Sequence, residues 1–311
     1  MSYELAKAWL VALNVAIAFA FGALFYWLFR KLRARFQCRM GPPVYQPIAD
    51  LLKLLTKETA VPASASRGWF VAAPSLALAG CLVAVALTPL GVEAPLSVVG
   101  DVLVVLIALI VPGVAVVIAG SSSGNPYGAI GASRELSLLV ASEIPFVASA
   151  LALARAAGGL SLQAIIEAQA ACPFIVKYPL AAIAFLMAMG LKLGRKPFDI
   201  PEAEVEIVAG PFTDYSGSLL GIFELGNIFK WMVLPALFVN LFLAGGRFTE
   251  VDALNFAAFL ALCAAVVFVA SFVDAQSARL RVDQAFKLLL SWGLGLALVD
   301  LVRASTGLLS W

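Results

Sequence analysis

Long apolar segments, separated by shorter polar ones, dominate the pattern of this 311-residue chain. A helix needs about 20 mainly apolar residues to cross the hydrocarbon core of a membrane. The segments that meet this requirement are 5–29, 70–90, 98–118, 136–154, 174–193, 219–244, 253–273 and 285–301. We therefore predict an all-α, polytopic membrane helix bundle of about eight transmembrane helices, with residues 1–311 forming a single integral membrane domain.

Composition supports the membrane assignment and excludes several kinds of chemistry. Apolar residues make up 62% of the chain and charged residues 13%, against roughly 45–50% and about 25% in soluble domains. The absence of histidine excludes histidine-based catalysis and most catalytic zinc sites. The four cysteines are far apart in sequence, so no Cys-x-x-Cys pair can hold an iron–sulfur cluster. We expect no catalytic residue, metal or cofactor in this chain, and its net charge of +2 argues against binding to nucleic acid.

The distribution of basic residues predicts how the bundle sits in the membrane. The first apolar segment is too long for a signal peptide and precedes its basic cluster, so we expect an anchor helix. Between the segments, 15 Lys and Arg residues fall on one side and 5 on the other, with Lys230 inside a segment. Because basic residues favour the cytoplasmic side, we predict a multi-pass cell-membrane protein with both termini outward. The polar loops 30–68, 194–218 and 274–284 would then face the cytoplasm.

The first polar loop combines a basic stretch with a short amphipathic helix. In 46–58 the apolar residues recur at helical spacing, which predicts a helix lying on the membrane or under a partner protein. The basic stretch has a simpler explanation, which is that it only orients the first helix. A Gly-Pro turn between the two elements favours a more specific role, as a docking surface. Its candidate residues are Arg35, Gln37, Arg39, Asp50 and Lys53.

Two glutamates in the fourth apolar segment are candidates for ion transfer. Glu143 lies deep in apolar sequence, and Glu135 lies two turns earlier, near the predicted cytoplasmic end. A carboxylate at that depth costs a few kcal/mol to insert, so it should face the interior of the bundle, and its default interpretation is functional. The alternative is a structural carboxyl group that bonds to a neighbouring helix.

An acidic cluster follows the fifth segment. Glu202 and Glu206 are four residues apart and would share one face of a helix, where like charges repel. The alternative is a solvated acidic loop, but the residues between the acids are apolar, which favours a cleft or a partner surface. The members of the cluster are Asp199, Glu202, Glu204, Glu206 and Asp214.

The sixth segment carries a further polar stripe. Glu224 and Asn227 are one turn apart on a helix, and Lys230 follows them. A pairing of Lys230 with an acid would lower the cost of both charges in the membrane. We therefore predict Glu224 as an ion-translocation carboxylate, with Asn227, Lys230 and Lys192 in supporting positions.

Four motifs, taken together, identify a family. They are RFQCRMGPPVYQPIADLLKLLTKE at 35–58, GASRE at 131–135, KPFDIPEAEVEIVAGPFTDYSG at 196–217 and ARLRVD at 278–283. With these motifs, nearly the whole chain resembles the membrane protein shared by respiratory complex I, where it is the H subunit, and the energy-converting, group 4 [NiFe] hydrogenases and formate hydrogenlyases. The eight-helix fold of that family, with both termini outward, agrees with the segments counted above.

Two departures from the complex I pattern narrow this resemblance. Quinone-reducing members have extra residues between the Arg-x-Gly-Pro element and the Gln-Pro helix, whereas residues 41–46 close that gap directly, as in the hydrogenase branch. A glutamate usual in complex I on the sixth helix corresponds to Asn227 here, with Glu224 one turn earlier. Whether Glu224 replaces it stays open at this point.

The resemblance implies a subunit without redox centres of its own. Its function would be ion translocation, of protons or sodium, in a group 4 membrane-bound [NiFe]-hydrogenase-type respiratory complex. The implied partners are hydrogenase-like large and small subunits and an iron–sulfur subunit, which contain the iron–sulfur clusters and the NiFe centre, together with antiporter-like membrane subunits. The alternatives are a quinone-chamber subunit of a complex I-like dehydrogenase and a purely structural anchor. The ion, the electron donor and the terminal acceptor, whether protons, a quinone or a sulfur compound, stay open.

Overall fold

The computed structural model describes residues 2–91, 96, 100–247 and 251–306, and the described residues form helices and loops without a strand. The all-α prediction is confirmed. Residues 98 and 99 of the predicted third segment lie outside the described residues. The helices are α1 (Ser2–Phe36), α2 (Gln46–Thr56), α3 (Arg67–Leu87), α4 (Asp101–Ser122), α5 (Pro126–Ala157), α6 (Leu162–Ala168), α7 (Phe174–Lys177), α8 (Pro179–Lys192), α9 (Glu204–Ile207), η1 (Gly210–Phe212), α10 (Gly217–Phe242), η2 (Ala244–Gly246), α11 (Asp252–Gln276), α12 (Val282–Lys287), the π-helical η3 (Leu288–Gly293) and α13 (Leu294–Thr306).

Seven of the described helices are long and apolar enough to cross a membrane, so the polytopic bundle is confirmed. They are α1, α3, α4, α5, α10, α11 and the continuous run from α12 to α13. The fifth predicted segment, 174–193, is instead broken into α7 and the 14-residue α8. The break lies at Tyr178, because Pro179 lacks an N–H donor and disfavours helical dihedral angles in the residue before it.

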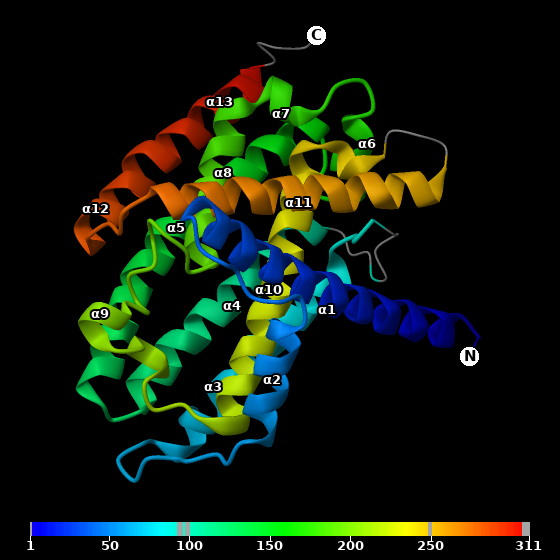
Figure 1. Cartoon of the computed structure of the whole chain (residues 1–311). Helices are drawn as coiled ribbons and strands as arrows, with labels where there is room; N and C mark the ends of the chain where they lie inside the picture. The colour runs from blue at the N-terminus through cyan, green and yellow to red at the C-terminus, as the bar shows by residue number, and fades with distance from the viewer. Residues whose placement is uncertain (1, 92–95, 97–99, 248–250, 307–311) are drawn as a thin grey trace.

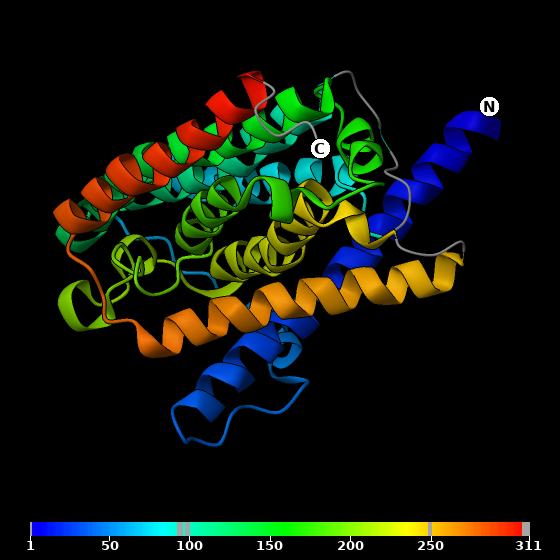
Figure 2. The same cartoon turned by 90° about the horizontal axis from the view of Figure 1, so that it is seen from above.

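Helix α10 forms the centre of the bundle. Viewed from above, α5 and α13 lie on one side of α10, and α11 and α1 lie on the other (Figure 2). Trp231 on α10 is fully buried and stacks near Phe29 of α1, with 4.6 Å between the ring centroids. Gly22 allows α1 to approach α10, because a Cβ atom there would overlap the carbonyl oxygen of Ile228. The second half of α10, from Trp231 to Phe242, is buried throughout, which suits such a central position.

The polar loops meet at one end of the bundle (Figure 1). The amide of Ala60 donates to Ser216 Oγ at 3.1 Å, which joins the first and second loops. The amide of Leu280 donates to the carbonyl of Pro197 at 3.1 Å, which joins the second and third. The start of α1 lies at the opposite end (Figure 2). The loops predicted to share the cytoplasmic side thus lie together, while the orientation of the bundle in the cell stays a prediction.

Candidate functional site

A cavity of about 420 Å³ lies among α1, α3, α4, α5 and α10, and the chain that follows α8 closes one side of it. Its walls carry both acidic and basic side chains at a depth where most neighbours are apolar. The ionisable residues that line it are Tyr26, Glu135, Lys192, Arg195, Asp199, Glu202, Glu224 and Lys230. The fold therefore brings together charged residues that are far apart in sequence.

The two glutamates of α5 occupy different positions relative to this cavity. Glu135 lines the cavity directly. Glu143 lies two turns further along α5, where its Oε1 accepts a hydrogen bond from the ammonium group of Lys192. The Lys192 side chain is only 5% exposed and lies over the ring of Phe146, 4.6 Å from its centroid. Lys192 is therefore the link between the cavity and Glu143.

The prediction that Glu202 and Glu206 share one face of a helix is wrong. Helix α9 begins only at Glu204, after Ala203 in an extended conformation, so Glu202 precedes the helix. Glu202 lines the cavity, whereas Glu206 lies outside it and pairs with Arg134 on α5 at 2.6 Å. The acidic cluster therefore does not act as one group of repelling charges.

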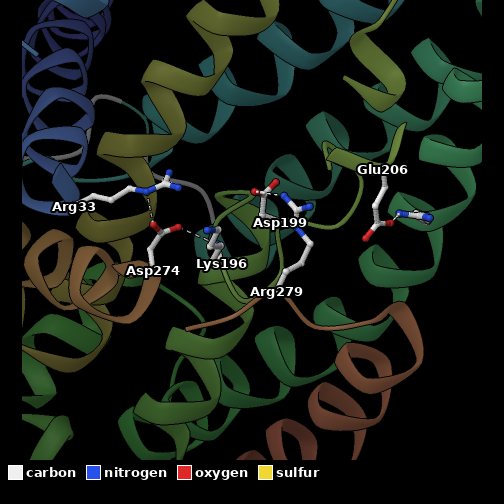
Figure 3. Close-up of polar contacts among 7 residues, drawn as sticks. Arg33, Lys196, Asp199, Glu206, Asp274 and Arg279 are labelled. Carbon is white, nitrogen blue, oxygen red and sulfur yellow. Dashed lines mark hydrogen bonds and ion pairs between the residues drawn. The ribbon is translucent and has the colours of Figure 1, made fainter. Parts of the chain in front are cut away.

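The other acids of this loop are also separated. Asp199 lines the cavity and pairs with Arg279, with 3.0 Å between Nη2 and Oδ2 (Figure 3). Asp214 follows η1 in the sequence. It accepts a hydrogen bond from Asn125 Nδ2 at 3.1 Å. The side chain of Glu204 lies outside the described residues. Of the predicted cluster, the structure thus brings Asp199 and Glu202 to the cavity.

Burial raises the pKa of the Glu202 carboxyl above its ordinary value of 4.5, and the charges of Arg195 and Lys230 oppose that rise. The side chain still has open surface toward the cavity. The opposite case is Glu206, where the hydrogen bond and charge of Arg134 lower the pKa. The same loop therefore holds one carboxyl group that retains a proton more readily and one that releases it more readily.

Helix α10 supplies the polar stripe that the sequence predicts. Glu224 and Asn227 both line the cavity. Lys230 also lines it, but its Nζ donates to the carbonyl oxygen of Lys192 at 3.4 Å and forms no ion pair with any carboxylate among the described side chains. The expected pairing of Lys230 with an acid is therefore replaced by a bond to the end of α8.

Sequence reasoning missed Arg195 and Tyr26 as residues of this site. The Arg195 guanidinium lies 5.5 Å from the ring centroid of Tyr26, 5.1 Å from that of Phe29 and 5.6 Å from that of Trp231. Aromatic faces attract cations electrostatically, which lowers the cost of burying this charge. Arg195 follows Gly194 just before the third motif, but nothing in the sequence shows that α1 and α10 supply its three rings.

Only part of the predicted docking surface is accessible. The predicted short helix is α2, and the side chains of Arg35, Arg39 and Lys53 are exposed, while Gln37 is half-buried. Asp50 accepts hydrogen bonds from Arg30 Nη1 at 3.0 Å and Gln46 Nε2 at 2.7 Å. Asp50 therefore attaches α2 to α1.

Two acids of the late helices, Asp274 on α11 and Asp300 on α13, have structural partners. Asp300 on α13 pairs with Arg303 at 2.7 Å and accepts a hydrogen bond from the amide of Ala181. Within the described part of the chain, no three His, Cys, Asp or Glu side chains come together as a metal site. The chemistry that this arrangement supports is proton or charge transfer between carboxyl and amino groups.

Comparison with known proteins places this geometry in a family. The model of the family described as NADH dehydrogenase matches residues 8–305. The chain is 36% identical over 286 residues to the H subunit of NADH-quinone oxidoreductase from Dehalococcoides mccartyi (strain CBDB1), and the match covers 90% of this chain and 80% of the relative. It is 35% identical over 304 residues to the H subunit of the same enzyme from Geobacillus kaustophilus (strain HTA426), covering 94% and 90%.

A solved structure is also similar over almost its full length. It is a chain of the membrane-bound sulfane sulfur reductase, an archaeal respiratory membrane complex, with a TM-score of 0.89 and 31% identity, covering 96% of this chain and 99% of that one. The sequence matches cover most of each chain, and the solved structure shares the arrangement of helices. This chain therefore belongs to the NADH dehydrogenase family of membrane proteins, which includes the H subunits of NADH-quinone oxidoreductases, and is a multi-pass membrane protein.

Proposed function

We propose that this chain is the ion-translocating membrane anchor subunit of a group 4 membrane-bound [NiFe]-hydrogenase-type respiratory complex. The observation that carries the proposal is the charged cavity, which lies next to the polar loops and continues through Lys192 to Glu143. An ion route needs carboxyl groups with two accessible protonation states and polar side chains or water between them. Ionisable side chains are costly to bury at membrane depth. Their presence there therefore supports a functional role.

In the proposed mechanism, the peripheral arm docks on the polar loops through Arg35, Arg39 and Lys53. Hydrogenase-like large and small subunits and an iron–sulfur subunit form that arm and contain the NiFe centre and the clusters, while antiporter-like subunits adjoin this chain in the membrane. Redox turnover in the arm changes the charge on Asp199 and Glu202. That change reaches Glu135, Glu224 and Glu143 through the cavity that these residues share or adjoin.

The direct link between the Arg-x-Gly-Pro element and α2 across residues 41–46 supports this branch over a quinone chamber. The NADH-quinone oxidoreductase relatives still make a quinone-chamber role the second candidate. A third is a role in a reductase acting on a sulfur compound, which the solved relative favours. Assays of the purified complex for hydrogen evolution, quinone-analogue reduction and polysulfide reduction distinguish the three.

Glu143→Gln tests the translocation role. In the complex reconstituted into vesicles, we expect this variant to lose ion pumping while hydrogenase activity with an artificial electron donor is retained. The control is Glu167→Gln, because Glu167 is exposed on α6 and lies away from the cavity. Unchanged pumping in Glu143→Gln, and in matching variants of Glu135 and Glu224, would show instead that the chain is a structural anchor.

A further inference from the structure

Lys192, which lines the cavity, is in contact with Glu143, and together they offer two kinds of oxygen that bind sodium ions in membrane proteins. One is the carboxylate of Glu143, and the other is the carbonyl of Lys192 at the end of α8. Hard cations are bound by several oxygen ligands at once, and broken helices in transporters offer backbone carbonyls for this purpose. By its oxygens alone, this location would suit Na⁺.

Both oxygen groups are already bound by ammonium groups of the same chain. The ammonium of Lys192 donates to Glu143 Oε1. The ammonium of Lys230 donates to the carbonyl oxygen of Lys192 at 3.4 Å. The Lys192 side chain is almost fully buried over the ring of Phe146, and Glu143 is the one carboxylate with which it forms an ion pair among the described side chains. A sodium ion would have to displace a tethered cation of equal charge and leave that cation buried without its partner.

The other acids do not complete a sodium site. No group of three acidic side chains comes together among the described residues. The free oxygen of Glu143, Oε2, is buried and has no hydrogen-bond partner. A single free oxygen is too few for Na⁺ but is sufficient for a proton.

We propose that Lys192 is a tethered cation that occupies the cation position at Glu143, so that this site exchanges protons and excludes Na⁺. The proposal rests on the proposed function, since it specifies the ion that the route carries. Lys192 acts here as a selectivity residue, and Lys230 supports it by occupying the neighbouring carbonyl.

Carbodiimide labelling of the purified complex tests the proposal without measuring pumping. This reagent modifies protonated carboxyl groups in apolar surroundings, and mass spectrometry locates the modified residue. We expect labelling of wild-type Glu143 to be the same in sodium chloride and in choline chloride. In Lys192→Gln we expect labelling of Glu143 to rise several-fold and to be reduced by Na⁺, because the position at Oε1 is then vacant. Lys192→Arg, which keeps a cation, should resemble the wild type.

The control is Lys287→Gln, because Lys287 is exposed on α12 and should leave the labelling of Glu143 unchanged. Protection of wild-type Glu143 by Na⁺ would overturn the proposal, and so would Lys192→Gln labelling that stays at the wild-type level. These outcomes are separate from the proposed function, which fails if Glu143→Gln pumps normally whatever the labelling shows.

Discussion

Arg33 and Asp274 form an ion pair between the last turns of α1 and α11, with 2.9 Å between Arg33 Nε and Asp274 Oδ2 (Figure 3). The same carboxylate accepts a hydrogen bond from the backbone amide of Lys196 at 3.0 Å. One buried acid therefore holds two helices and the loop that closes the cavity. The neutral amide in Asp274→Asn would remove the charge at nearly constant shape.

We expect Asp274→Asn to lower the free energy of unfolding by about 2 kcal/mol. Loss of one partner of a buried ion pair costs roughly 3–5 kcal/mol, and a smaller value applies here because a third of the Arg33 side chain is exposed. Thermal unfolding of the purified complex in detergent measures the effect. Asp283→Asn is the control, since Asp283 is exposed, and an equal loss in both variants would contradict the role given to Asp274.

Gly22→Ala should weaken the packing of α1 on α10. A methyl group at residue 22 overlaps the carbonyl oxygen of Ile228, which is backbone and cannot turn away. Overpacking of this kind costs about 1–3 kcal/mol. The melting temperature of the variant should fall, whereas that of Gly295→Ala should not, because a Cβ atom at residue 295 of α13 meets no atom within 4 Å. Equal melting temperatures for Gly22→Ala and the wild type would show that α1 shifts freely.

Glu202→Gln should increase stability in a pH-dependent manner. Desolvation at the cavity wall raises the pKa of Glu202 above 4.5 in the folded chain, although the residue is partly open to solvent, so the folded state favours the protonated form. The stability associated with that proton is complete below pH 4.5 and is lost as pH rises through the folded pKa. The neutral amide removes this loss. Melting curves of the variant and the wild type should therefore agree at low pH and separate toward neutral pH, with the variant melting higher; separation in the opposite direction would contradict the pKa shift.

Charge reversal at the exposed basic residues tests the docking surface. Arg35→Glu combined with Arg39→Glu should weaken the association of this chain with its peripheral partners several-fold, and more strongly at low salt, because exposed charges act over about a Debye length. Copurification from detergent extracts at two salt concentrations measures this effect. Arg247→Glu is the matched control, since Arg247 is exposed beyond the end of α10, away from the polar loops. Copurification equal to that of the control would place the docking surface elsewhere.

The helices could be predicted from sequence because membrane insertion imposes a long apolar segment on each span. Seven predicted segments correspond to long helices. The break in the fifth segment, 174–193, was also encoded, since a proline stands at residue 179, but hydropathy alone does not reveal it. The divergence of Glu202 and Glu206 has a similar origin, because α9 is a single turn that begins after Glu202. Residue spacing predicts a shared helix face only where the helix is longer than this single turn.

The site was predictable as a set of residues but not as an arrangement. Glu135, Glu202 and Glu224 attract attention because charges in apolar sequence are costly. Which of them meet depends on contacts between distant segments, as the bond between Lys230 and Lys192 shows. Arg195 was missed because its three aromatic neighbours belong to α1 and α10. A basic residue in a polar loop looks the same in sequence whether it faces water or an aromatic cage.

The short length of α8 has an electrical consequence. Its 14 residues cover about 21 Å at 1.5 Å per residue, against a hydrocarbon core of about 30 Å. Beyond its end, the chain from Leu193 to Glu202 lines the cavity instead of continuing as an apolar helix. Because the cavity lies between helices long enough to span a membrane and carries charged side chains, it would shorten the insulating layer at this point. The transmembrane voltage then falls over a shorter distance, so each charge that moves near Glu143 experiences a steeper field than it would in an intact bilayer.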